Sequence, residues 1–169
     1  MPRPDLSRVP EFYHNYISQV PGNDLMEAFR KESPSFIDFF ETIPPSKYDY
    51  RYADGKWTIK EVVQHIIDAE RVFNYRALRF ARKDNTPLPG FDEDLFAKNS
   101  KASSRNWNDL LEEFKSVRRS SEYLFDSFDE EQLESSGISN NHPNYVLGIG
   151  YIIIGHSVHH KNVVRERYL

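Results

Sequence analysis

Residues 57–71 read WTIKEVVQHIIDAER, and this stretch indicates the fold class. Thr58 and Glu61 form the S/T-x-x-E pattern of a capping box, in which each side chain satisfies a backbone N–H at the start of a helix. Apolar residues then recur at steps of three and four residues up to about Arg82, which is typical of an amphipathic helix. The stretch therefore predicts a long helix that carries His65 among apolar neighbours.

Three further segments show the same spacing of apolar residues. Pro34 lies inside the first of them and predicts a kink or a split, because proline interrupts the hydrogen bonds of a helix. Residues 83–105 are polar and form a connection long enough to cross from one end of a bundle to the other. We find no convincing strand and expect a loop at residues 137–143. The pattern predicts an all-α four-helix bundle, up-down with one long crossover connection, with long helices at about 24–43, 57–82, 107–128 and 144–167 and a short one at 129–134.

The two ends of the chain differ in character. Residues 1–22 contain four prolines and predict a lead-in with at most a short helical turn. The last predicted helix contains Gly148, Gly150 and Gly155, each of which is unfavourable in a helix by roughly 1 kcal/mol relative to alanine. We interpret these glycines as points where another helix approaches closely.

The composition predicts one soluble globular domain over residues 1–169, with 38% hydrophobic and 14% aromatic residues. The net charge is −4 and no block of five basic residues occurs, which argues against a nucleic-acid partner. The absence of cysteine excludes disulfides and thiolate metal sites. No signal peptide is evident, and the most apolar stretch, residues 145–155, is too short to span a bilayer. We therefore expect a cytoplasmic protein without a membrane partner.

Three histidines are the main candidates for metal ligands in this sequence. His156 and His160 are four residues apart on one predicted helix, so their side chains point the same way with Cβ atoms ~5–6 Å apart. That separation lets two imidazoles bind one ion, and His65, also flanked by apolar residues, is a candidate third ligand. The alternative is a set of core histidines bonded to carbonyls or carboxylates. Three imidazoles suit zinc, nickel, iron and copper alike, so the residues leave the metal open.

Charged residues of the 57–82 helix are candidates for supporting roles. Asp68 lies one turn after His65 on nearly the same face, where it could ligate the ion, orient a histidine or act as a base. Glu70 is expected to point to the surface. Arg76 shares the inward side and is a candidate for binding the carboxylates of an acidic substrate or cofactor, although a solvated, ion-paired face is the alternative.

At these residues the sequence resembles the DinB/YfiT-like superfamily of metal-dependent enzymes. The similarity lies in residues 57–71, in residues 75–80 and 89–94, and in the final segment Gly155-His156-Ser157-Val158-His159-His160. The resemblance implies a four-helix bundle, often dimeric, with a zinc or nickel ion on His65, His156 and His160. It also implies a similarity to S-transferases and isomerases that use a low-molecular-weight thiol.

Three functions remain open from the sequence. The first is a metal-dependent, thiol-dependent S-transferase acting on a small molecule, with Asp68 as the candidate base and Arg76 as a candidate contact to the thiol cofactor. A metal-dependent hydrolase is the alternative within the enzyme class. The second function is a non-catalytic stress-response binding module with a structural metal, and the third is a helical scaffold without metal.

Overall fold

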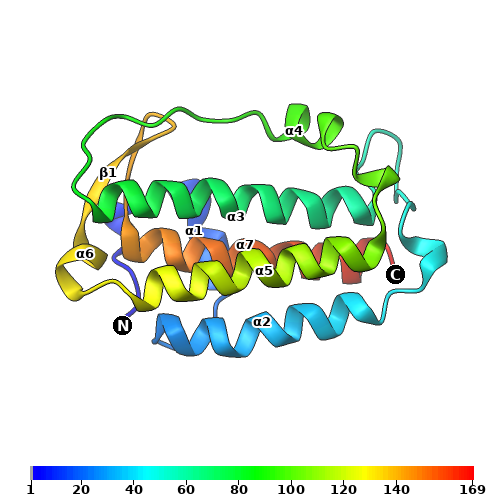
Figure 1. Ribbon diagram of the computed structural model, residues 1–169, viewed down its shortest axis with the longest axis horizontal. Coiled ribbons are helices and arrows are strands. Elements are labelled where there is room, and N and C mark those ends of the chain that lie inside the picture. Colours follow the sequence, from blue (N-terminus) through cyan, green and yellow to red (C-terminus); the bar gives the residue numbers. More distant parts are fainter. Residues whose placement is uncertain (1) are drawn as a thin grey trace.

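Four long helices lie side by side along the molecule in the computed structural model, which describes residues 2–169 (Figure 1). Their ends agree with the predicted ranges to within a few residues, which confirms the four-helix bundle. The bundle consists of α2 (Leu25–Glu41), α3 (Ile59–Ala81), α5 (Trp107–Asp126) and α7 (Val146–Arg167). Three short elements precede α2: η1 (Leu6–Arg8), η2 (Glu11–Tyr13) and α1 (His14–Ser18). The connections between the long helices contain η3 (Pro45–Lys47), α4 (Glu93–Asn99), η4 (Ala102–Ser104), α6 (Glu130–Glu134), β1 (Ser136–Ser139) and β2 (His142–Tyr145).

The long connection between α3 and α5 sets the topology of the bundle. In Figure 1, α2 and α7 run from the left end to the right end, whereas α3 and α5 both run back from right to left. The chain must therefore return along the whole bundle after α3, and it does so in the predicted crossover, which carries α4 and η4. This arrangement places α3 against both α5 and α7.

Local hydrogen bonds explain where the helices begin. At the start of α3, the Thr58 N–H donates to Glu61 Oε2 (2.8 Å) and the Glu61 N–H donates to Thr58 Oγ1 (3.1 Å), which confirms the capping box. Asp24 caps α2 by accepting from the Glu27 N–H (2.8 Å). Pro34 does not split α2, which continues through it, because buried aromatic side chains hold the helix on both sides of the proline.

The predicted loop at residues 137–143 is wrong, because this segment belongs to a two-stranded antiparallel hairpin. Ser139 pairs with His142, which leaves Asn140 and Asn141 as a two-residue turn. Both asparagines have positive φ, 50° and 63°, the backbone conformation that tight hairpin turns require and that asparagine tolerates. Leu88 of the crossover joins this hairpin through a backbone bond to the Ile138 carbonyl (2.9 Å). The hairpin thereby ties the crossover to the segment that leads into α7.

The core of the bundle consists of two apolar clusters separated by polar side chains. One cluster includes Phe29, Phe73, Phe125 and Ile152, and the other includes Phe36, Ile66, Phe114 and Val164. Each long helix carries polar side chains near the point where it passes from one cluster to the other, and we call this set the polar belt. The polar belt comprises Glu32 and Ser35 of α2, His65 and Glu70 of α3, Arg118 and Ser121 of α5, and His156, Ser157, His160 and Lys161 of α7.

The lead-in before α2 packs on the outside of α7, where Gly155 allows an unusually close approach. A Cβ atom at Gly155 would lie 2.1 Å from the backbone oxygen of Tyr16 in α1. The interpretation of the glycines as points of close approach is confirmed here, since a side chain would push α1 away. None of the helices in the described residues 2–169 combines the length and the apolar character that a bilayer span requires.

Candidate metal centre

Three imidazoles from two helices converge in the polar belt. The Nε2 atom of His156 lies 3.0 Å from Nε2 of His65 and 3.1 Å from Nε2 of His160. His65 comes from α3, whereas His156 and His160 are one turn apart on α7. Ligand-capable atoms of the three side chains all lie within 4.8 Å of one another. The structure thus brings together the three predicted ligands, although His65 and His156 are 91 residues apart in sequence.

The environment keeps these imidazoles in the form that binds metals. Burial lowers the pKa of His65 from 6.5 to about 4. Burial also lowers the pKa of His156 and of His160 well below 6.5, and the neighbouring histidines lower both further. A neutral imidazole offers a ring-nitrogen lone pair, which is the donor that a divalent transition metal requires.

The contacts of the three nitrogens fit an ion better than they fit core hydrogen bonding. Within residues 2–169, the polar contacts of these Nε2 atoms are to one another, and no backbone carbonyl or carboxylate bonds to them. Nitrogen atoms 3.0–3.1 Å apart can each lie at ~2.0–2.1 Å from one ion. The residues therefore fit a divalent metal on His65, His156 and His160.

Aromatic side chains enclose the three histidines. The Trp57 ring packs on His65 at 4.7 Å between ring centroids, and Tyr16 packs on His156 at 5.4 Å. Tyr16 reaches this position because Gly155 lets α1 lie directly on α7. Such walls exclude water from His65 and His156, whereas His160 is only partly buried and faces an opening.

That opening is a cleft of about 470 Å³ beside the histidines. His160 and His159 line one side of it, and Trp57 lines another. Ligand sites for small molecules commonly occupy 300–1,000 Å³. A small organic molecule in this cleft can therefore reach the open side of the candidate metal centre.

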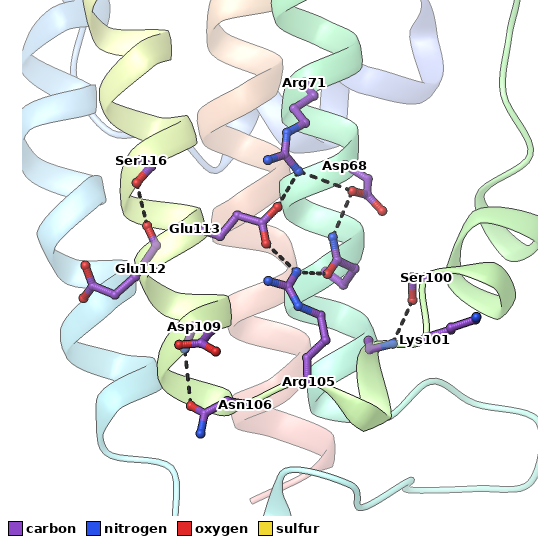
Figure 2. Close-up of polar contacts among 12 residues, drawn as sticks. Asp68, Arg71, Ser100, Lys101, Arg105, Asn106, Asp109, Glu112, Glu113 and Ser116 are labelled. Carbon is purple, nitrogen blue, oxygen red and sulfur yellow. Dashed lines mark hydrogen bonds and ion pairs between the residues drawn. The ribbon is translucent and has the colours of Figure 1, made fainter.

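Asp68 lies in a polar network between α3 and α5 (Figure 2). Its carboxylate accepts from Gln64 Nε2 (2.9 Å) and lies 3.7 Å from Arg71 Nη1. Arg105 donates to Gln64 Oε1 (2.6 Å), which attaches the end of the crossover to α3. Burial raises the pKa of Asp68, while the hydrogen bond from Gln64 and the charge of Arg71 oppose that rise. Asp68 belongs neither to the three-histidine group nor to the cleft lining, so its role as a base stays a prediction.

The expectation that Glu70 points to the surface is wrong. Glu70 is 2% exposed and forms a two-point ion pair with Arg118, at 2.9 Å from Nε and 2.8 Å from Nη2. Arg118 Nη2 also donates to Ser157 Oγ (2.6 Å), next to His156 in sequence. Arg118 therefore links α5 to both of the helices that carry the candidate ligands.

Arg76 is buried on the inward side of α3, as expected, but away from the cleft lining. Its Nη2 donates to the Pro89 carbonyl of the crossover (3.1 Å). Its guanidinium also lies 5.9 Å from the ring of Phe73, which in turn packs on His156. The structure shows Arg76 anchoring the crossover, and its contact to a cofactor stays a prediction.

Three charged residues of the cleft were not singled out from the sequence. Lys56, Asp94 and Arg167 line the cleft together with His160. Asp94 lies in the 89–94 segment that contributes to the family resemblance, so the sequence contains one indication that this residue is functional. Lys56 and Arg167 have no such signal, because only the fold brings the start of α3 next to the end of α7.

Comparisons with known proteins agree with this architecture. The sequence matches the DinB superfamily model over residues 28–164, which is most of the chain. The chain belongs to the DinB superfamily. Among solved structures it is similar to YfiT from Bacillus subtilis, described as a probable metal-dependent hydrolase with an unusual four-helix bundle topology. The TM-score is 0.71, with 18% identity, and the match covers 96% of this chain and 89% of YfiT. This likeness to YfiT shows the fold alone. No curated protein matches the sequence of this DinB-superfamily chain.

Proposed function

We propose that this protein is a metal-dependent enzyme that activates a small nucleophile beside the cleft. The observation that carries the proposal is the convergence of three imidazole nitrogens next to an open cleft, with no fourth protein ligand among the described residues. Structural sites are usually saturated by four protein ligands, whereas catalytic sites keep a position for substrate or water. The open side at His160 therefore favours catalysis over a purely structural metal.

The first candidate reaction is transfer of a low-molecular-weight thiol to an electrophilic substrate. An ion on the three histidines would lower the pKa of a coordinated thiol or water and so supply a nucleophile at neutral pH. Trp57 and Tyr16 exclude bulk water from the buried histidines, and the cleft holds the organic substrate. In the transfer, the thiol loses its proton, its sulfur bonds to the electrophilic carbon, and the leaving group departs with its electron pair.

Hydrolysis is the second candidate reaction, with water in place of the thiol. It is favoured by the fold likeness to YfiT, which is described as a probable metal-dependent hydrolase. Both reactions use the same histidines and the same cleft, so a direct comparison of thiol transfer and ester hydrolysis separates them.

Zinc or nickel is the proposed metal and a homodimer the proposed assembly, as the family resemblance implies. Elemental mass spectrometry identifies the bound metal in protein purified without added ions. Light scattering coupled to size-exclusion chromatography measures the molar mass, for which a protomer contributes 19.9 kDa. A mass of one protomer at all concentrations would overturn the proposed dimer without affecting the metal site.

The central experiment measures the metal content of the untagged protein and of two histidine variants. We expect close to one ion per chain in the wild type and in His142→Ala, whose side chain lies outside the three-histidine group. We expect loss of the ion in His156→Ala, together with loss of turnover. Thiol transfer is assayed with an activated aryl halide and hydrolysis with a nitrophenyl ester. A wild-type protein that takes up neither zinc nor nickel, or a metal-free variant with full activity, would refute the proposal.

A further inference from the structure

The cleft beside the histidines contains charges that the protein itself does not neutralise. Lys56 and Arg167 line the cleft, and within residues 2–169 the ammonium group of Lys56 and the guanidinium group of Arg167 form no ion pair or hydrogen bond. The lining contains one carboxylate, that of Asp94, which lies on α4. Two unpaired cations facing one cleft attract an anionic group.

The backbone around these two cations is held by several hydrogen bonds. Arg51 Nη1 donates to the Lys56 carbonyl (2.6 Å) and also pairs with Glu61 Oε2 (3.0 Å) of the α3 capping box. The Tyr168 hydroxyl donates to the Trp57 carbonyl (2.8 Å), which attaches the end of α7 to the start of α3. Lys56 and Arg167 therefore extend from backbone positions that are fixed relative to each other, so less conformational freedom is lost on binding.

Three aromatic side chains form part of the cleft wall together with the cations. Trp57, Tyr52 and Tyr168 line the cleft, and the guanidinium of Arg167 lies 5.5 Å from the ring centroid of Tyr52. Tyr52 and Tyr168 pack edge to face at 4.9 Å between centroids. Such walls favour a flat apolar body, because aromatic rings stack or pack edge to face with one another.

We infer that the substrate of this site is a small organic anion with a flat apolar body, whose carboxylate is bound by Lys56 and Arg167. This inference rests on the proposed function, since it names the substrate class for the same cleft. The lining carries two cations and one carboxylate, that of Asp94, so it favours an anionic substrate. A cationic substrate would be repelled by Lys56 and Arg167.

The test uses three probes of one shape that differ in charge: benzoate, benzyl alcohol and benzylamine. Each is titrated into metal-free ¹⁵N-labelled protein while the tryptophan indole signals are followed. The chain has two tryptophans, and the Trp57→Phe variant identifies the signal of Trp57. We expect benzoate to shift this signal saturably, benzyl alcohol to bind more weakly and benzylamine weakest. The use of metal-free protein separates the test of the anionic substrate from the test of the metal-dependent function. Benzoate binding does not need the ion, and metal binding does not need benzoate.

Matched variants assign the binding to the two cations. Lys56→Met and Arg167→Met should each weaken benzoate binding by up to about fivefold, the range for exposed ion pairs, because both cations are exposed. Arg165→Met is the control, because Arg165 is also in the last turn of α7 but bonds to Asn162 instead of lining the cleft. Benzylamine binding as tightly as benzoate, no shift of the Trp57 signal, or equal effects of all three variants would each overturn the inference.

Discussion

Glu70 and Arg118 form a two-point ion pair in the middle of the bundle, and both side chains are only 2% exposed. Ser121 Oγ donates to the same carboxylate (2.5 Å), and Ser157 Oγ accepts from the guanidinium (2.6 Å). These bonds connect α3, α5 and α7, so the pair fixes the two ligand-bearing helices against each other. The candidate metal centre therefore depends on residues that do not contact it.

Removing one partner of this pair should destabilise the protein strongly. Arg118→Met leaves the Glu70 carboxylate buried without its cation, and such changes cost about 3–5 kcal/mol. The double variant Glu70→Met/Arg118→Met should lose less, because no unpaired charge remains. Urea unfolding of the single and double variants measures this difference in the free energy of unfolding. A double variant as unstable as the sum of both single variants would contradict the expectation.

The stability of the metal-free protein should fall as the pH is lowered from about 7 to about 4. The folded-state pKa of His65 is about 4, below its ordinary value of 6.5, so the unfolded chain binds more protons in this interval. A depression of that size corresponds to about 3 kcal/mol at 1.36 kcal/mol per pKa unit.

Thermal unfolding across this pH range, with chelator present, compares the wild type with His65→Gln. The variant should show a shallower loss of stability toward acid pH, because one of the three low-pKa imidazoles is absent. If stability depends on pH equally in the two proteins, the pKa of His65 is not lowered in the folded state, and the prediction fails.

A methyl group at Gly155 should displace α1 from α7. The added Cβ would meet the Tyr16 backbone oxygen at 2.1 Å, and backbone cannot move aside as a side-chain end can. We expect Gly155→Ala to cost about 1–3 kcal/mol, the range for overpacked cores. Gly148→Ala is the comparison, since its Cβ would first meet a side-chain methyl of Val9 at 2.7 Å. Differential scanning calorimetry should rank Gly155→Ala as the less stable, and the reverse order would contradict the prediction.

The proposed roles of Asp68 and Arg76 make different predictions for catalysis. If Asp68 is the base, Asp68→Asn should lower kcat by about 10²–10⁴-fold without changing the metal content. If Arg76 binds a cofactor carboxylate, Arg76→Met should raise the KM for the thiol and leave hydrolysis unchanged. Steady-state kinetics with both substrates gives these values. A kcat within twofold of the wild type in Asp68→Asn would remove Asp68 from the mechanism.

Features with a strong local cause could be predicted from the sequence. The capping box at Thr58 fixes the start of α3, and the four-residue spacing of His156 and His160 places both imidazoles on one side of α7. The hairpin turn at Asn140-Asn141 also has a local cause. Its strands have four residues each, which is too few for an alternation of apolar and polar residues to reveal them in the sequence.

Some features that depend on packing between distant segments could not be predicted, although His65 was correctly grouped with His156 and His160. Glu70 lies about 140° around the helix from His65. If α3 buried only the face that carries His65, the Glu70 side chain would be exposed. It is buried because α3 packs against both α5 and α7, and its partner Arg118 is 48 residues away. The cleft cations Lys56 and Arg167 likewise meet only after folding.

The polar belt also determines the axial register of the bundle. Apolar clusters alone specify the alignment of helices less sharply, because cores of the right volume and pattern tolerate alternative packings. A slip of one turn, about 5.4 Å, would move Arg118 away from Glu70 and place an unpaired charge among apolar side chains. The belt thus selects a single alignment of the four helices, and in that alignment His65 lies level with His156 and His160.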